Sequence, residues 1–254
     1  MKWHMTPFFS LLCSVLLLLS CENSFKSEYS SNANIENSEE NIKIVESIKI
    51  NEAPKHSKTP SEAITHQFEV IFEDGSTQLP TENDIISETI IGNQGILTIH
   101  SPEGKDRYAS FLYHMEDEWI LDAILRVSAI GDVVFKEKEG LYLPMEEFNF
   151  LKIKVEVNSQ NQELWVFVDP ENIITITTLD RFNFVENSET QKVRLSNENE
   201  AYISKDDYEN YFLYYYDIEK IIIIAGNIKE REELINIANS LPSVTDPAFP
   251  ATTK

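Results

Sequence analysis

The stretch that decides the fold is Tyr211-Phe212-Leu213-Tyr214-Tyr215-Tyr216-Asp217-Ile218-Glu219-Lys220-Ile221-Ile222-Ile223-Ile224. Two strongly apolar runs flank a short polar turn, which is the pattern of a β-hairpin. Strands this apolar would pair with other chains if they were exposed. We therefore expect the hairpin to lie centrally in a sheet or to be covered by other elements.

A helix is predicted directly after this hairpin. Asn227 is a candidate N-cap, and Glu230 follows three residues later, as in a capping box. Apolar residues then recur at helical spacing, and Pro242 ends the pattern. Leu234, Ile235, Ala238 and Leu241 form the apolar stripe, which we expect to pack on the sheet.

The rest of the folded region reads as short strands separated by turns. Residues 150–157 alternate apolar and polar side chains, whereas 164–168 are apolar on both faces and predict a central strand. The further predicted strands are 68–72, 85–91, 96–100, 108–115, 119–124, 133–135, 141–143, 173–177, 192–195 and 201–203. The expected fold class is α+β, a mostly antiparallel β-sheet system, half-barrel-like or two packed sheets, with one C-terminal α-helix.

The N-terminus predicts a signal segment. Lys2 precedes an uncharged, apolar run that is short for a membrane span. The run ends in Leu18-Leu19-Ser20-Cys21, which resembles the lipobox of bacterial lipoproteins. The resemblance implies cleavage before Cys21 and acylation of its thiol, with chains such as palmitate, and two or three chains give stable anchoring. An ordinary cleaved signal and an uncleaved N-terminal anchor are the alternatives.

Composition limits the classes of partner. The net charge is −22, which disfavours nucleic acids and anionic headgroups because both require Lys/Arg patches. A solvated acidic exterior explains this charge, and binding of a cation or a basic protein is the alternative. Cys13 leaves with the signal and Cys21 is acylated, so we expect no disulfide.

The predicted organisation has five parts. Residues 1–20 are the lipoprotein signal peptide, and 21–65 form a flexible polar tether rich in Ser, Asn, Glu and Lys. Within the tether, the alternation over 42–50 allows an edge strand, a loose segment or a partner-docking strip. Residues 66–150 form a β-rich part and 151–242 a sheet with the C-terminal helix, as one domain or two. Residues 243–254 read as a tail.

A second resemblance concerns the C-terminal part. The run from Ile221 to Leu241, with Gly226-Asn227 and the acidic residues before the apolar stripe, resembles the last strand and helix of an uncharacterised domain of Gram-positive envelope proteins. That domain is related to the half-barrels of the lipoprotein-carrier LolA/LppX type. Residues 164–170 are similar to a strand and turn of those half-barrels. The resemblance implies a curved sheet closed by a helix, sometimes with an apolar cavity, and no catalytic residues.

No motif of a known chemistry emerges from the sequence. His56, His66, His100 and His114 lack zinc-binding spacing, and no nucleophile-elbow or phosphate-binding glycine motif is present. We therefore expect no catalytic residue, no metal site and no cofactor. Turn carboxylates are interpreted as solvated residues rather than calcium ligands: Asp74, Glu116, Asp117, Glu118, Asp206 and Asp207.

Candidate ligand-facing residues come from the apolar strands. Trp165, Phe167 and Phe212 line a ligand site or belong to the core. The aromatic cluster Tyr208, Tyr211, Phe212, Tyr214, Tyr215 and Tyr216 fits a sugar- or peptide-binding platform, but core packing explains it as well.

The leading hypothesis is a non-enzymatic lipoprotein of the bacterial cell envelope. It is anchored in the cell membrane or the outer membrane, faces outside the cytoplasm, and binds a hydrophobic ligand or an envelope protein. The alternatives are an extracytoplasmic hydrolase that uses paired carboxylates and a purely structural surface lipoprotein. Two facing carboxylates in a polar cleft would favour the hydrolase, and a cavity near Trp165 and the helix would favour a ligand carrier.

Overall fold

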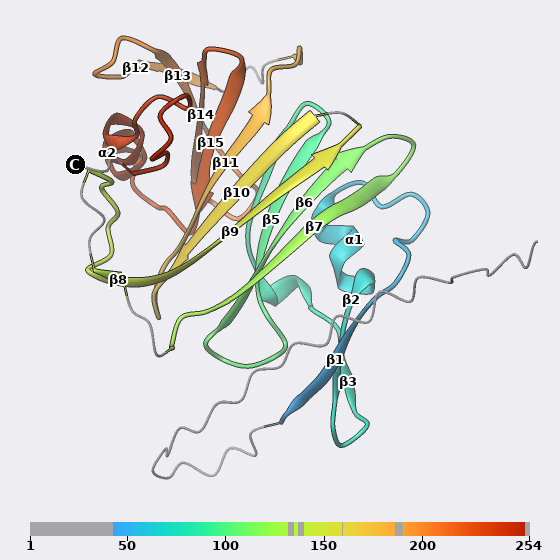
Figure 1. Ribbon diagram of the computed structural model, residues 1–254. Coiled ribbons are helices and arrows are strands. Elements are labelled where there is room, and N and C mark those ends of the chain that lie inside the picture. The colour runs from blue at the N-terminus through green and yellow to red at the C-terminus, as the bar shows by residue number, and fades with distance from the viewer. Residues whose placement is uncertain (1–42, 132–134, 137–139, 159, 186–189, 252–254) are drawn as a thin grey trace, which may run out of the picture. The chain divides into compact units, whose positions relative to one another are not determined.

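Three antiparallel sheets and two α-helices make up the part of the chain that the computed structural model describes, residues 43–131, 135–136, 140–158, 160–185 and 190–251 (Figure 1). The expected β-rich α+β class with a C-terminal helix is therefore confirmed. No helix among these residues is long and apolar enough to cross a membrane. Cys21 and the predicted signal peptide lie outside the described residues.

The largest sheet has eight strands in the order β12-β13-β14-β15-β11-β10-β9-β8. The predicted hairpin at residues 211–224 is formed by β14 and β15, and it lies inside this sheet as predicted. β10 is likewise central, between β9 and β11. The strands are β8 (Phe135–Lys136), β9 (Glu147–Val157), β10 (Gln160–Val168), β11 (Ile173–Asp180), β12 (Gln191–Arg194), β13 (Glu200–Lys205), β14 (Tyr211–Asp217) and β15 (Lys220–Gly226).

A four-stranded meander forms the second sheet. Its strands follow chain order, β4 (Ile85–Ile91), β5 (Gln94–His100), β6 (Arg107–Met115) and β7 (Trp119–Ser128). Gly92, with φ of +59°, begins the two-residue turn between β4 and β5. A Cβ there would meet the ring of Phe182 and the Cβ of Phe184, each at 2.8 Å, so the close approach of this segment also requires glycine. β4 and β7 are the edge strands of this sheet.

The third sheet contains β1 (Val45–Ile50), β2 (Phe68–Phe72) and β3 (Thr77–Gln78). Helix α1 (Pro60–Gln67) joins β1 to β2, and a 3₁₀ helix η1 (Glu82–Asp84) precedes β4. The predicted polar tether, residues 21–65, is therefore wrong over its last part. The possible edge strand within it is formed as β1, and α1 was not predicted at all. Residues 21–42 lie outside the described part.

Three apolar clusters separate these layers. Alternate residues of β10 point to opposite faces of the large sheet, so Trp165 and Phe167 pack toward α2 (Arg231–Ser240), and Leu164 and Val166 pack toward the four-stranded sheet. A third cluster lies between the other face of the four-stranded sheet, α1 and the small sheet, with Phe111 at its centre. The core is thus three packed interfaces.

The segments beside α2 differ from the sequence prediction. Residues 141–143 were predicted as a strand, but they are irregular chain, and Leu141 and Leu143 are buried against the helix side of the large sheet. The predicted tail also folds back on this side, where Val244 N–H donates to Asp217 at 2.8 Å and Phe249 packs on Trp165. Residues 133 and 134 of the other predicted strand are outside the described part.

The N-terminus of α2 also differs from the prediction. The helix begins after Glu230, which makes no side-chain cap. Asn227 instead lies before it and joins two strand ends, because its Oδ1 accepts from Ile173 N–H at 2.9 Å and its Nδ2 donates to Glu171 O at 2.8 Å. The apolar stripe itself is confirmed, since Leu234 and Ala238 are fully buried.

Candidate functional site

The three candidate ligand-facing residues are buried side chains. Trp165 is 4% exposed and lies against Phe249, with ring centroids 5.2 Å apart. Phe167 is fully buried between the rings of Phe148 and Phe150. Phe212 is 9% exposed and belongs to the core between the two large sheets. Trp165 and Phe167 therefore lie in packed core beside α2.

The predicted aromatic platform is divided by the strand alternation of β14. Tyr211 and Tyr215 pack on the α2 side of the sheet, whereas Phe212, Tyr214 and Tyr216 pack on the side of the four-stranded sheet. Tyr214 stacks on Tyr202 with centroids 4.9 Å apart. The aromatic residues mainly contact one another and the core, so they do not form one exposed surface.

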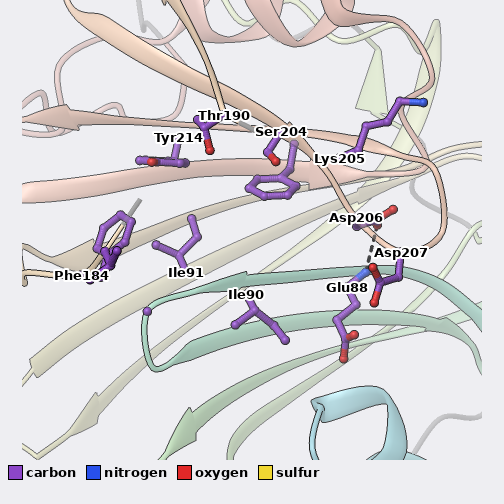
Figure 2. A pocket seen from close by; sticks show the side chains of 13 residues that line it. Glu88, Ile90, Ile91, Phe184, Thr190, Ser204, Lys205, Asp206, Asp207 and Tyr214 are labelled. Atoms are coloured by element: carbon purple, nitrogen blue, oxygen red, sulfur yellow. Dashed lines mark hydrogen bonds between the residues drawn. The ribbon is translucent and has the colours of Figure 1, made fainter. Parts of the chain in front are cut away.

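Two surface grooves meet at Glu88 and Asp207. The smaller, which we call the β4 groove, has a volume of about 170 Å³ and lies between the end of β4 and strands β13 and β14 (Figure 2). The larger, the α1 groove, has a volume of about 590 Å³ and is lined by residues 54–66 with Glu82 and Tyr208. Both grooves include Glu88 and Asp207, so they adjoin.

Glu88 connects three segments that are far apart in the sequence. Its Oε1 accepts a hydrogen bond from Ser61 N–H at 2.7 Å, near the start of α1. There the carboxylate supplements the N-cap Thr59, whose Oγ1 accepts from Glu62 N–H at 3.2 Å. Its own N–H donates to Asp206 Oδ2 at 3.1 Å, in the loop between β13 and β14 (Figure 2).

The loop carrying Asp206 is held by side chains. Asp206 Oδ1 accepts from Tyr208 N–H at 3.0 Å and from Asn210 N–H at 2.8 Å. Asn210, 2% exposed, donates from Nδ2 to Ile86 O at 2.7 Å. Two side chains of this loop therefore bond the outer edge of β4. Asp206 is half-buried, so its interpretation as a solvated turn residue was wrong, whereas Asp207 is exposed as expected.

Burial dominates the electrostatics of this junction. Desolvation raises the pKa of Glu88 above its ordinary value, and the charges of Asp207 and Asp206 act in the same direction, while the hydrogen bonds from Ser61 oppose them. Desolvation likewise raises the pKa of Asp206, against the hydrogen bonds from Asn210. The junction thus concentrates carboxylates in a site that disfavours their charge.

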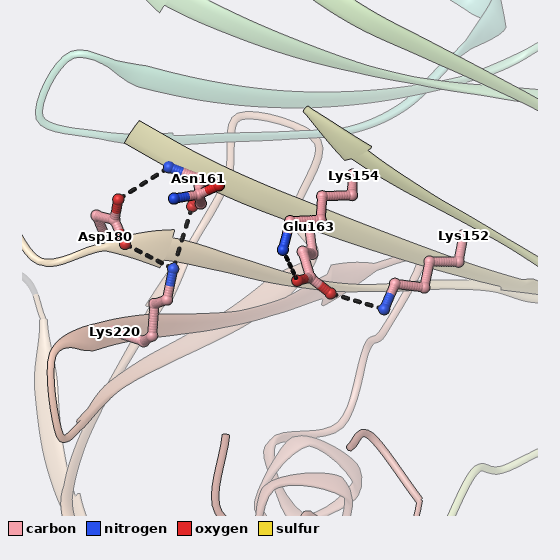
Figure 3. A network of polar contacts seen from close by, with 6 residues as sticks. All are labelled: Lys152, Lys154, Asn161, Glu163, Asp180 and Lys220. Atoms are coloured by element: carbon pink, nitrogen blue, oxygen red, sulfur yellow. Dashed lines mark hydrogen bonds and ion pairs between the residues drawn. The ribbon is translucent and has the colours of Figure 1, made fainter. Parts of the chain in front are cut away.

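Other polar side chains in the described part pair with side chains of neighbouring strands and so link the strands of the sheets. His114 Nδ1 lies 2.7 Å from Asp122 Oδ1 across β6 and β7, and burial raises the pKa of Asp122. In the large sheet, Glu163 of β10 pairs with Lys152 and Lys154 of β9. Asp180 of β11 pairs with Lys220 of β15 (Figure 3). No group of three or more His, Cys, Asp or Glu side chains among the described residues is arranged to hold a metal ion.

No protein-family model matches the chain, and no curated protein matches it in sequence.

Proposed function

We propose that this chain is a lipid-anchored, extracytoplasmic protein of the bacterial cell envelope that binds a protein partner and is not an enzyme. The lipobox-like sequence ending at Cys21 supports the anchor. The observation that carries the binding role is the junction at Glu88, where α1, β4 and the 206–210 loop leave two adjoining grooves open on the surface.

Packing and groove size favour a protein partner over a hydrophobic ligand. The side chains beside α2 that would line an apolar cavity, Trp165 and Phe167, are in contact with core residues. Small-molecule sites typically measure about 300–1,000 Å³ and are mostly apolar. The β4 groove, at about 170 Å³, is smaller than that, and the α1 groove is lined mostly by polar and charged side chains. Both grooves are therefore better suited to receive side chains of a docked protein than a hydrophobic ligand.

The anchor is tested by Cys21→Ser. We expect the variant to leave the membrane fraction without unfolding, because the thiol that would be acylated is gone. Fractionation of cell envelopes, with circular dichroism of the released protein, measures both points. Continued membrane association after the leader has been removed would contradict the anchor.

The partner role is tested by site-specific photocrosslinking in intact envelopes. A photoreactive residue at Ile90, in the β4 groove, is expected to give one discrete protein adduct. The matched control carries it at Leu151 on β9, an apolar side chain that is 43% exposed and outside both grooves, and no adduct is expected there. Absence of an adduct at Ile90 would leave the structural surface lipoprotein as the better proposal.

A native mass spectrum of the Cys21→Ser protein separates a partner from a lipid ligand. We expect the mass of the polypeptide alone. A co-purifying lipid would overturn the preference for a protein partner.

The second candidate function is a hydrolase with paired carboxylates, favoured by the raised pKa values of Glu88 and Asp206 beside the grooves. Asp206 is engaged by four hydrogen bonds, which favours the structural role. Hydrolysis of envelope glycans that is lost in Glu88→Gln but kept in Glu198→Gln would support the enzyme instead.

A further inference from the structure

We infer that the free edge of β4 is the docking site, and that it takes up an extended segment of the partner protein by strand addition, with apolar and basic side chains alternating along the segment. This inference depends on the proposed function, a protein-binding role, and specifies the chemistry of the partner.

The backbone of β4 shows where such a strand can pair. β4 is the edge of its sheet, and its outer groups Ile86 O and Glu88 N–H are already bonded by Asn210 and Asp206. The N–H and C=O groups of successive strand residues point to opposite edges. Ile90, two residues after Glu88, therefore also points its N–H away from β5. Among the described residues nothing bonds that N–H or the C=O of Glu88. Within the part of the chain that the structure describes, the edge is therefore bonded up to the N–H of residue 88 and unbonded at the Glu88 C=O and the Ile90 N–H.

The side chains beside the open edge are of two kinds. Ile91 points toward Tyr214 on one face of β4, whereas Glu88 and Ile90 point the opposite way (Figure 2). Phe212 and Tyr214 line the β4 groove next to Ile91. Ile90 is 37% exposed, which is unusual for an isoleucine on an otherwise buried strand. An added strand would therefore place alternate side chains against an apolar surface and beside Glu88 and Asp207.

The charges beside the β4 edge determine which polar side chains the partner's segment should carry. Glu88, Asp206 and Asp207 lie at the edge, and the whole chain has a net charge of −22. Lys or Arg beside these carboxylates would be attracted, and Asp or Glu would be repelled. Because Lys205 is the one cation lining the described part of the β4 groove, and it already pairs with Glu209 at 2.7 Å, it does not reverse this preference.

The first experiment uses the mature Cys21→Ser chain and synthetic six-residue peptides. One peptide alternates Leu and Lys, a second alternates Leu and Glu, and a third is the Leu/Lys peptide N-methylated along one backbone edge. We expect the Leu/Lys peptide to bind and to slow hydrogen exchange at the Ile90 amide at least tenfold, measured by NMR. The Leu/Glu peptide should not bind, and N-methylation should weaken binding at least tenfold. The Ile91 amide, bonded to β5, is the internal reference.

Variants at one position then separate backbone from side-chain contacts. Ile90→Pro removes an N–H that points away from β5, so the β4–β5 ladder is kept, and we expect at least tenfold weaker peptide binding. Ile90→Ala truncates the side chain but keeps the N–H and should change affinity less than threefold. Asp207→Asn should reduce the preference for Lys over Glu. Equal binding of the N-methylated peptide, or an Ile90 amide that exchanges slowly without peptide, would overturn strand addition.

The two proposals fail in different ways. A photocrosslinked adduct at Ile90 without binding of the Leu/Lys peptide overturns the stated chemistry of the segment and leaves the partner role intact. The absence of any adduct at Ile90 overturns the partner role itself.

Discussion

Glu88 shows how much one side chain can organise in this protein. Its carboxylate accepts from the backbone of α1, and its own N–H is bonded by Asp206 from a loop 118 residues later. A buried N–H that loses its acceptor costs about 1–3 kcal/mol, because water does not replace the lost bond. Glu88 therefore contributes to stability and also sets the boundary between the two grooves.

Two substitutions at Glu88 separate loss of the acceptor oxygen from loss of the charge. Glu88→Ala leaves the N–H of Ser61, a residue that is 8% exposed, without its acceptor, and should lower the free energy of unfolding by about 1–3 kcal/mol. Glu88→Gln keeps an acceptor oxygen and should cost less. Urea denaturation at pH 7 measures both, with the exposed Glu198→Ala as control. Equal losses in the two Glu88 variants would contradict the capping role.

The same site predicts a pH dependence. A carboxyl whose pKa is raised in the folded state binds more protons there than in the unfolded chain, so the free energy of unfolding falls as pH rises from the ordinary value of 4.5 through the raised pKa. Glu88→Gln should lose this contribution and gain stability relative to the parent as pH rises through that window. Asp206 has a shift of the same sign, so part of the slope should persist. A parallel pH profile in the variant would show that Glu88 does not titrate with folding.

The sequence alone could not identify Glu88. A glutamate between Ser87 and Thr89 looks like an ordinary polar residue in the middle of a β-rich run. Its partners Ser61 and Asp206 come from segments whose approach depends on the tertiary fold. Asp206 was likewise hidden, because an Asp-Asp pair before Tyr208 has the composition of a solvated turn.

The two helices show which helical features a local sequence pattern fails to predict: the existence of α1 and the N-cap of α2. α1 has eight residues, which is too short to be stable by itself in water. It is held by the cap at Glu88 and by Tyr113 Oη–H, which donates to Gln67 at 2.9 Å. The periodic apolar stripe of α2 was predicted correctly, but its cap was not, since Asn227 bonds strand ends instead.

The prediction for this element concerns Asn227. Asn227→Ala removes both the acceptor for Ile173 N–H and the donor to Glu171 O, and should lower the free energy of unfolding by about 1–2 kcal/mol. Glu230→Ala, at the true N-cap, should cost under about 0.5 kcal/mol because its side chain makes no cap bond. Thermal unfolding followed by circular dichroism compares them. A larger loss for Glu230→Ala would mean that the helix cap dominates after all.

In the molecule as a whole, the α2 side of the eight-stranded sheet is covered by packed side chains, among which Trp165 is buried. Trp165 is covered by Phe249 and by Lys152, whose Nζ lies 4.4 Å from the ring centroid. Phe249 comes from a segment that the sequence presented as a tail with two prolines, whereas Lys152 comes from β9. The strands were predicted well because alternation reports burial on each face, whereas irregular segments that fill space carry no periodic signal.

Removing the Phe249 ring tests whether it shields Trp165. Phe249→Ala removes a partly buried ring and should cost about 1–3 kcal/mol, less than the ~3–5 kcal/mol of a fully buried phenylalanine. Trp165 should gain solvent contact, which shifts tryptophan emission to longer wavelength. The control is Ile218→Ala, since that side chain is 59% exposed in a turn. An unchanged emission maximum would show that Phe249 does not shield Trp165.

The distribution of the cores along the chain has a consequence for synthesis. The cluster around Phe111 takes its residues from 45 to 124, apart from Tyr208. The cluster around Trp165 extends to Ala251. During synthesis from the N-terminus, the residues of the first cluster up to Ile124 are made well before Ala251, which the second cluster includes. We therefore expect the cluster around Phe111 to pack before the cluster around Trp165 is complete.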